Sequence, residues 1–277
     1  MEWWHAILFG VIEGVTEFLP VSSTGHLTIA EKLLGYRIDD PDITAFTAII
    51  QVGAVLATVL YLRRDIWRVG VAWFRGLADE KQRKRDYKFG WAVLIGSIPI
   101  GIIGLLFKDE IEGVLRSLWF VAGALILWSV VMWFADRHAK QDRGERDTTW
   151  HDTLIIGITQ CLALIPGISR SGATMSAGLL RGFDRVTVTR LSFFLSIPAL
   201  LAAAILQTAT EFDQINNGVG WGPTLLATTV SFGVAYVAVA WLLKFIARHD
   251  YSIFIWYRVA IGLVLIVLLS TNIIEPV

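Results

Sequence analysis

The sequence has few charged residues and almost no cysteine. Asp, Glu, Lys and Arg make up 17% of its 277 residues, whereas soluble domains have about 25%. The formal net charge is zero, so no overall attraction toward nucleic acid is expected and we predict no nucleic-acid partner. Cys161 is the single cysteine, which excludes an intrachain disulfide and a zinc site built on cysteines.

Long apolar segments dominate instead. Hydrophobic residues make up 55% of the chain, and the mean hydropathy is +0.60. A bilayer core about 30 Å thick is crossed by roughly 20 apolar helical residues. Six segments have that length: 43–62, 89–107, 118–135, 191–210, 224–243 and 251–274. Arg258 is the only charged residue inside them. We therefore predict an all-α polytopic membrane protein whose residues 1–277 form a single membrane domain.

Two further apolar segments, 3–34 and 151–182, do not fit a spanning helix. The first is interrupted by LPVSSTG and the second by IPGISRSG, which leaves each arm too short to cross a bilayer. Backbone that leaves the helix at membrane depth is tolerated where it is buried in protein or lines a cavity. We predict that each segment is a re-entrant helical hairpin.

Basic residues are concentrated in loops on one face of the predicted bundle. Loops 63–88, 136–150, 181–190 and 244–250 hold nine, four, three and two Lys or Arg residues. The opposite loops hold four: Lys32, Arg37, Lys108 and Arg116. Because basic loops mark the cytoplasmic side, segment 151–182 must enter and leave from the cytoplasm. Segment 3–34 must then enter from the opposite face.

The two hairpins indicate an internal duplication. A shift of 147 positions aligns Trp3 with Trp150 and Gly10 with Gly157, and carries SSTG onto SRSG without a gap. Together with the topology, this predicts an inverted repeat with a first half in 1–135 and a second in 148–277. Each half has one re-entrant hairpin and three transmembrane helices. Such proteins bind substrates on broken helices at the repeat interface.

A hydroxyl cluster follows each break. Ser and Thr are favoured N-cap residues, and the first turn of a helix attracts anions through its unpaired N–H groups and positive dipole end. If the hairpins meet near the midplane, two helix starts and Arg170 converge on one spot. The guanidinium fork suits phosphate or carboxylate oxygens. The sequence thus predicts an anion site inside the membrane.

Other ionisable side chains accompany the first cluster. Glu13 and Glu17 are i, i+4 neighbours on one helical face, and Ser23 and His26 are i, i+3 neighbours on another. The two acids, the nucleophile Ser23, the base His26 and the anion clamp Arg170 would therefore share one cavity. Ionisable residues at membrane depth are costly, which favours a functional role for both glutamates.

Structural roles are the alternative for these residues. The hydroxyls of residues 22–24 would serve as helix caps alone, His26 would be a satisfied buried histidine, and Arg170 would form a static ion pair with Glu17. Arg258 has no hydroxyl neighbours in its segment, which favours helix packing or snorkelling.

The motifs EGVTEFLPVSSTGH and PGISRSGAT resemble the two signature motifs of the bacterial undecaprenyl-diphosphate phosphatases associated with bacitracin resistance. The resemblance covers essentially the whole chain. It implies hydrolysis of undecaprenyl diphosphate to undecaprenyl phosphate and phosphate, which recycles the lipid carrier for cell-wall polymers. It also implies a divalent cation, Mg²⁺ or Ca²⁺, and a bacterial inner-membrane location with a site opening to the periplasmic face. The expected partners are a long-chain isoprenoid diphosphate lipid and the membrane, with a homodimer left open.

The resemblance also assigns roles by motif match. It implies that Glu17, Ser23, His26 and Arg170 are catalytic, and that Glu13 and Glu17 bind the metal. The expected substrate-binding residues within the motifs are Ser22, Thr24, Gly25, Ser169, Ser171 and Gly172, and Gln51, in IIQVGA, is expected as a further substrate-binding residue of the cavity.

Two alternatives stay open at this point. Ser23 would attack the phosphate with His26 as base and Glu17 orienting it, or the same His–Glu pair would activate a water. The rival function is a secondary transporter or flippase for an anionic lipid or small anion, because broken helices in inverted repeats are a transporter architecture. The Ser23–His26 pair favours an enzyme, since transport needs no nucleophile.

Overall fold

The computed structural model describes residues 1–107 and 117–276. Lys108 and Arg116, which the sequence assigns to the outer face, lie outside these ranges. Six of the described helices are long and apolar enough to cross a membrane. They are α3 (Pro41–Tyr61), α5 (Arg85–Leu106), α7 (Leu118–His138), α10 (Arg185–Thr210), α12 (Trp221–Ile246) and α13 (Ser252–Ser270). The prediction of an all-α protein with six such spans is confirmed.

Both interrupted segments fold as pairs of short helices. The first contains α1 (Trp3–Thr16) and α2 (Ser23–Leu33), and the second contains α8 (Trp150–Gln160), the 3-10 helix η4 (Cys161–Leu164) and α9 (Arg170–Leu180). Within each pair the two α-helices pack on each other. The longest of these arms, α1, has 14 residues, or about 21 Å at 1.5 Å per residue, which is too short to span. The predicted breaks are confirmed, whereas the faces from which the hairpins enter stay predictions.

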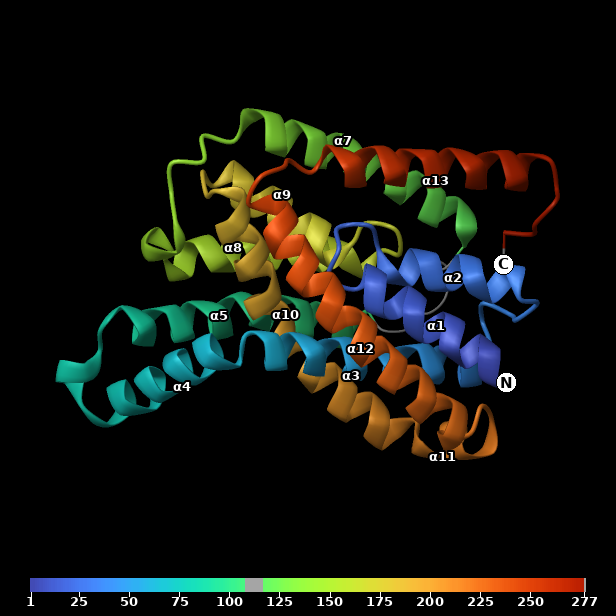
Figure 1. The fold of residues 1–277 in the computed structure, drawn as a ribbon, viewed down its shortest axis with the longest axis horizontal. Helices are drawn as coiled ribbons and strands as arrows, with labels where there is room; N and C mark the ends of the chain where they lie inside the picture. The colour runs from blue at the N-terminus through green and yellow to red at the C-terminus, as the bar shows by residue number, and fades with distance from the viewer. Residues whose placement is uncertain (108–116, 277) are drawn as a thin grey trace.

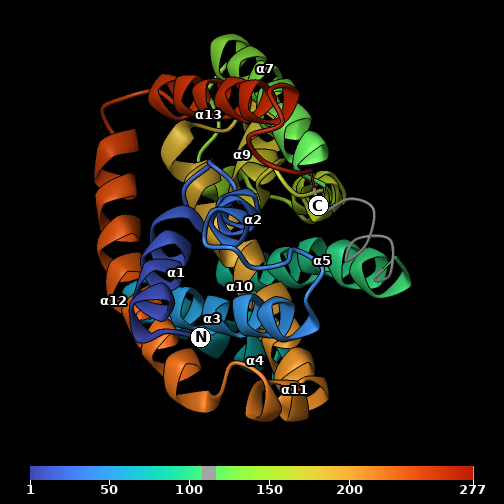
Figure 2. The ribbon, with the colours of Figure 1, turned by 90° about the vertical axis from the view of Figure 1, so that its right-hand side faces the viewer.

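Each hairpin packs against a span from the other half of the chain. Helix α1 lies along α12, and α8 lies along α5 (Figures 1 and 2). Glycines permit the close approach, because a Cβ on Gly10 would lie 2.5 Å from the Ala227 carbonyl oxygen, and one on Gly157 would lie 1.9 Å from the Gly96 carbonyl oxygen. Gly10 and Gly157 are the pair that the shift of 147 positions aligns. Such matching close packing is what an inverted repeat would give, and the repeat and its boundaries stay predictions.

A buried carboxylate closes the open end of the second hairpin, outside the six spanning helices. Asp152, in the first turn of α8, accepts hydrogen bonds from Arg143 at 2.7 Å and from Arg181, just after α9, at 2.8 Å. Burial alone would raise the pKa of Asp152, but hydrogen bonds from Arg143, Thr149 and Arg181 outweigh it and hold this pKa well below its usual range. The two arginines thereby fix the ends of α8 and α9 relative to each other.

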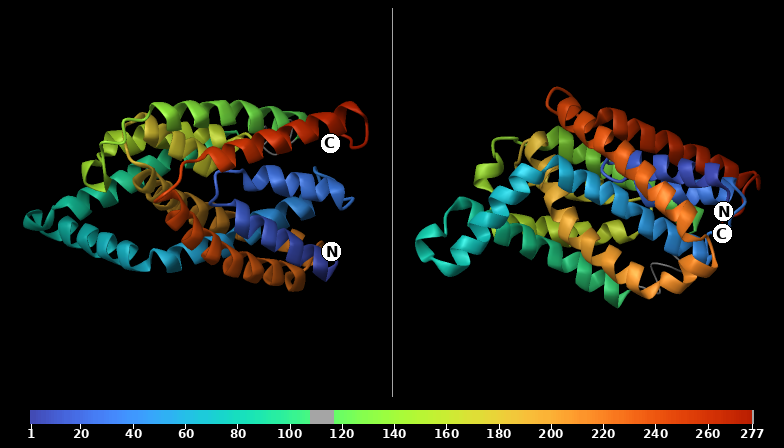
Figure 3. Two further views of the ribbon diagram at one scale, coloured as in Figure 1. Left: turned by 45° about the horizontal axis from the view of Figure 1, so that its top comes forward. Right: turned by 60° about the horizontal axis from the view of Figure 1, so that its bottom comes forward.

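The long basic loop predicted over 63–88 is largely helical, which corrects the expectation. It contains α4 (Arg63–Ala78), the 3-10 helix η1 (Glu80–Gln82) and the first turn of α5. Together with the start of α5, α4 projects from one end of the molecule (Figure 3). Shorter helices also lie in other connections, namely η3 (Glu145–Asp147) and α11 (Phe212–Asn217).

Candidate active site

The two helix breaks have the same local design. Ser22 precedes α2 with φ 77°, and Ser169 precedes α9 with φ 76°. Each serine side chain caps its helix, since Ser22 Oγ accepts from the Gly25 amide at 3.3 Å and Ser169 Oγ accepts from the Gly172 amide at 3.2 Å. The expected N-caps are therefore present in both hairpins. The positive φ values turn the chain sharply into each helix start, a conformation that costs a non-glycine residue energy.

Direct hydrogen bonds join the two breaks. The Gly167 amide donates to Ser22 Oγ at 3.1 Å, and Ser171 Oγ donates to the Leu19 carbonyl oxygen at 2.8 Å. These residues are 145 and 152 positions apart in the chain. The expectation that the hairpins meet is therefore confirmed.

Arg258 in α13 forms hydrogen bonds to both breaks. Its wholly buried guanidinium donates to the carbonyl oxygens of Pro20 at 3.3 Å and Gly167 at 2.9 Å, one from each break. No ion pair between Arg258 and a carboxylate occurs within the described residues, so carbonyl dipoles and the Ser129 hydroxyl, 3.1 Å away, satisfy it. The packing role expected for Arg258 is present, whereas snorkelling is excluded by its burial.

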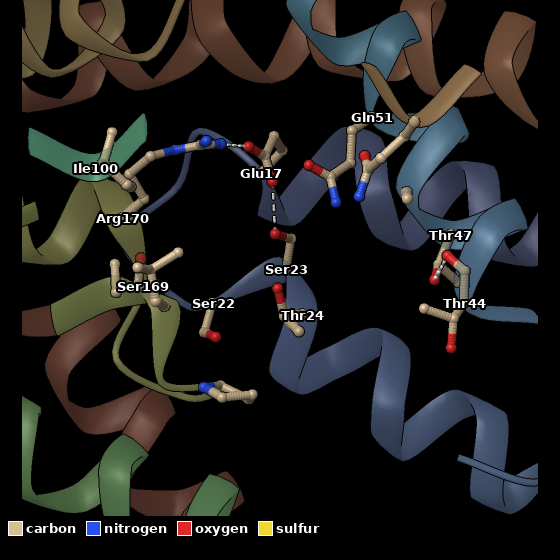
Figure 4. Close-up of a pocket in the computed structure, with 15 residues that line it drawn as sticks. Glu17, Ser22, Ser23, Thr24, Thr44, Thr47, Gln51, Ile100, Ser169 and Arg170 are labelled. Carbon is tan, nitrogen blue, oxygen red and sulfur yellow. Dashed lines mark hydrogen bonds and ion pairs between the residues drawn. The ribbon is translucent and has the colours of Figure 1, made fainter. Parts of the chain in front are cut away.

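A cavity of about 260 Å³ lies between the breaks (Figure 4). Ser23 and Arg170, at the first positions of α2 and α9, both line it, which confirms that they face one cavity. Residues of the two hairpins supply most of its polar wall: Glu17, Ser22, Ser23, Thr24, Ser169 and Arg170. The opposite polar wall comes from α3 and α10 and has only uncharged groups: Thr44, Thr47, Gln51 and Gln207.

Glu17 connects the two halves of this site. Ser23 Oγ donates a hydrogen bond of 2.5 Å to one Glu17 carboxylate oxygen, and the Arg170 guanidinium forms an ion pair with the other (Figure 4). The carboxylate is nearly inaccessible to solvent, at 3% exposure. Hydroxyl, carboxylate and guanidinium therefore form a continuous chain in which the Glu17 carboxylate contacts both Ser23 and Arg170.

Glu13 lies one helical turn before Glu17 and is completely buried. Neither of its carboxylate oxygens hydrogen-bonds to any residue within the described ranges, and it is not among the residues that line the cavity. Its electrostatic partner is Arg170. The residue that the 147-position shift aligns with it, Gln160, is also fully buried with both amide atoms unpaired among the described residues.

His26 does not occupy the position that the sequence predicts. Its Nδ1 lies 2.7 Å from the Ser22 carbonyl oxygen and its Nε2 lies 2.7 Å from the Tyr257 hydroxyl, while the ring stacks on the Tyr257 ring. The expected Ser23–His26 and Glu17–His26 contacts are thus replaced. Ser23 points toward Glu17, whereas His26, three residues later on α2, points toward Tyr257 on α13.

The predicted substrate-binding residues fall into two groups. Ser22, Thr24, Gln51 and Ser169 line the cavity. Three others lie behind its wall and support it through the cap and cross-link hydrogen bonds described above: Gly25, Ser171 and Gly172. These three residues do not line the cavity, so the structure gives them a supporting position behind its wall.

Several residues of the site are absent from the sequence-based prediction. Thr44, Thr47 and Gln207 line the cavity, and Tyr257 holds His26. An uncharged polar residue within an apolar span was the available signal for Gln207. No local pattern points to Tyr257, because its partner lies 231 positions away.

Among the described residues the candidate metal ligands are two carboxylates, Glu17 in the cavity wall and Glu13 one helical turn before it. No group of three or more His, Cys, Asp or Glu side chains able to hold a metal occurs among residues 1–107 and 117–276. Glu13 and Glu17 form a pair one turn apart, and Glu13 has unpartnered oxygens. Magnesium is commonly held by one or two carboxylates, with waters and substrate phosphates completing its coordination. The pair fits such a shared site, although it would not form a complete protein cage.

Comparison with known proteins shows the family of this chain. Residues 6–264 match the family described as bacitracin resistance protein BacA. The chain is 68% identical to undecaprenyl-diphosphatase 3 of Frankia casuarinae, with 98% of each chain covered. It is 56% identical to the undecaprenyl-diphosphatase of Cutibacterium acnes, with 99% of each covered. It is also 50% identical to undecaprenyl-diphosphatase 1 of Streptomyces coelicolor, over 98% of this chain and 97% of the relative. This chain therefore belongs to the BacA family.

Proposed function

We propose that this protein hydrolyses undecaprenyl diphosphate to undecaprenyl phosphate and inorganic phosphate, which recycles the lipid carrier of cell-wall polymer synthesis. The relatives named above are called undecaprenyl-diphosphatases, and they align with nearly the whole of this chain. The observation that carries the proposal is the contact of Ser23 with Glu17, beside Arg170, where two helix starts meet in one cavity. Nucleophile, proton acceptor and anion clamp are the groups that phosphoanhydride cleavage requires.

In the first step, Ser23 Oγ attacks the terminal phosphorus of the diphosphate. Its proton passes to Glu17, which is already within 2.5 Å. The bond between this phosphorus and the bridging oxygen breaks, and undecaprenyl phosphate leaves with the bonding electrons. Arg170 exchanges its ion pair with Glu17 for the phosphoryl oxygens, which frees the carboxylate to accept the proton. The N-termini of α2 and α9 add positive dipole ends on the same side.

In the second step, water attacks the phosphoserine. The bond between Ser23 Oγ and phosphorus breaks, and Glu17 returns the proton to the serine oxygen. The released phosphate carries both protons of the attacking water as H2PO4⁻, and Arg170 again pairs with Glu17. His26 supports this cycle as a residue that orients the start of α2, because its ring bonds the Ser22 carbonyl oxygen rather than Ser23.

A divalent cation, Mg²⁺ or Ca²⁺, is part of the proposal. Glu13 and Glu17 would hold it together with oxygens of the diphosphate. When bound, it would neutralise negative charge on the phosphoryl oxygens. The fully buried oxygens of Glu13, which accept no hydrogen bond, support this assignment, because burying a carboxylate without hydrogen bonds is costly.

The cavity is proposed to open toward the periplasmic face of the bacterial inner membrane. Thr44 lies in the first turns of α3 and Gln207 near the end of α10, and both line the cavity. These helix ends are opposite the basic segments at 63–88 and 181–190, which the positive-inside rule assigns to the cytoplasm. A homodimer stays a prediction.

A transporter or flippase is the second candidate, because the equivalent packing of broken helices α1 and α8 is an arrangement that transporters use. Purified protein in detergent separates the two functions, since detergent removes the compartments that transport needs. We expect equal amounts of undecaprenyl phosphate, measured by mass spectrometry, and of inorganic phosphate. Undecaprenyl diphosphate recovered intact, with bound lipid detected on the protein, would overturn hydrolysis in favour of transport.

A further inference from the structure

Helix α4 combines exposed apolar and basic side chains at the end of a membrane span. It begins two residues after the last residue of α3. Trp67 and Phe74 are 75% and 68% exposed, while the four basic residues of the helix are also exposed: Arg63, Arg64, Arg68 and Arg75. An amphipathic helix with arginines and aromatic residues is suited to the interface between lipid headgroups and acyl chains.

A groove of about 500 Å³ lies between α4, η1 and the start of α5. Trp67, Val71 and Ala72 form its apolar wall. Its polar wall contains Arg68, Arg75, Gln82, Lys84, Arg85 and Asp86. The groove is remote from the candidate active site in the chain and shares no lining residue with it.

The charges of the groove are unbalanced. Arg68 pairs with Asp86 at 2.9 Å, and Arg85 pairs with Glu145 at 3.4 Å. Arg75 and Lys84 form no ion pair with any carboxylate in the part of the chain that the structure describes. Two unpaired cations thus face the same groove as an exposed indole. The groove therefore complements a ligand with one anionic and one apolar part.

We propose that this groove binds the headgroup of an anionic phospholipid. Arg75 and Lys84 would contact the phosphate, because a guanidinium fork and an ammonium are the usual phosphate ligands in proteins. Trp67 would lie beside the glycerol and the upper acyl chain, the level that tryptophan prefers in membranes. The lipid would tie the α4–α5 projection to the membrane surface, independently of hydrolysis at the candidate active site.

Quenching of Trp67 by brominated lipid tests this proposal. The protein is placed in phosphatidylcholine nanodiscs that contain a small fraction of brominated phosphatidylglycerol or, in parallel, brominated phosphatidylcholine. The difference between the parent and Trp67→Phe isolates the signal of Trp67 from the other tryptophans. We expect stronger quenching of Trp67 by phosphatidylglycerol at equal lipid fraction, with the excess reduced by added salt.

Paired variants assign the effect to the groove. Arg75→Gln/Lys84→Gln should weaken the preference for phosphatidylglycerol about 30-fold, since each residue would lose a direct hydrogen bond to the lipid phosphate, and each such bond contributes about a factor of five or more. Arg64→Gln/Lys81→Gln removes the same charge from residues that do not line the groove and should keep most of the preference. Equal quenching by the two lipids, or equal loss in both double variants, would overturn the proposal. Phosphate release is not the readout, so failure here leaves the proposed hydrolysis untouched.

Discussion

Ser22 and Ser169 have nearly the same backbone conformation, with φ values of 77° and 76°, at positions that a shift of 147 aligns. Each caps the helix that follows it. Ser22 also accepts a hydrogen bond from Gly167, in the other break. One strained turn, used twice, therefore directs the starts of α2 and α9 to one cavity, which Ser23 and Arg170 both line.

The positive φ of this turn predicts that a glycine substitution at Ser169 is tolerated, whereas a β-branched residue is not. Ser169→Gly should leave thermal stability nearly unchanged, because glycine relieves a positive φ that costs about 1 kcal/mol while loss of the cap costs a few tenths. Ser169→Val should destabilise the protein by roughly 2 kcal/mol, since a β-branched residue at positive φ is strained and has no capping oxygen. Thermal unfolding in detergent measures both variants. Equal losses for glycine and valine would contradict the strained-turn description.

Arg170→Lys should lose turnover although the charge is kept. One ammonium cannot reproduce the fork that would hold phosphoryl oxygens, and arginines that stabilise phosphoryl transfer contribute about 10³–10⁵ in rate. Phosphate release from undecaprenyl diphosphate measures the effect, with thermal unfolding as the check that the lysine variant folds. A folded Arg170→Lys protein with most of its turnover would make the Glu17–Arg170 contact a static ion pair.

Glu13→Gln tests the metal without a large change in shape. The fold should tolerate it, because the aligned buried position already holds Gln160. The concentration of Mg²⁺ or Ca²⁺ needed for half-maximal phosphate release should rise by roughly tenfold or more, the loss typical even of outer partners of a metal. Chelation should abolish phosphate release by the parent. Full activity in excess chelator would remove the cation from the mechanism.

Asp152 should make stability depend on acid pH. Its folded pKa is lowered, so its contribution is complete above the unfolded pKa of about 3.9 and is lost as the pH falls through the folded value. At pH 7, Asp152→Asn should cost about 2 kcal/mol, because charge-assisted hydrogen bonds from two arginines are lost. The difference from the parent should shrink below about pH 4. Asp142→Asn, which changes an exposed carboxylate in the loop before α8, is the control, and an equal loss there would contradict the clamp.

The spans and the breaks could be predicted because their causes are local. Twenty apolar residues are sufficient evidence for a spanning helix, and PVSST or PGISRS inside an apolar segment is sufficient evidence for an interruption. The meeting of Ser23 and Arg170 followed from topology and the 147-position alignment. Helix α4 was missed because its basic residues were counted only as loop charge, although Trp67, Val71 and Phe74 recur at helical spacing.

The partners of individual side chains could not be predicted in the same way. The i, i+3 spacing of Ser23 and His26 permits a hydrogen bond, but the side-chain rotamer is decided by Tyr257 on α13. Glu17 was expected to orient His26, yet it accepts directly from Ser23 because both lie at the turn between α1 and α2. The sequence predicts a packing role for Arg258, but it does not predict that Arg258 donates hydrogen bonds to carbonyl oxygens of both breaks.

The central claim is that Ser23 attacks the terminal phosphorus with Glu17 as its proton acceptor. The most direct measurement is the stereochemical course at that phosphorus, with a substrate whose terminal group is made chiral by sulfur and oxygen isotopes. Two displacements, through a phosphoserine at Ser23, predict released thiophosphate with retained configuration. Inverted configuration would contradict the account, because it requires direct attack by water and would leave Ser23 as a ligand of the phosphate.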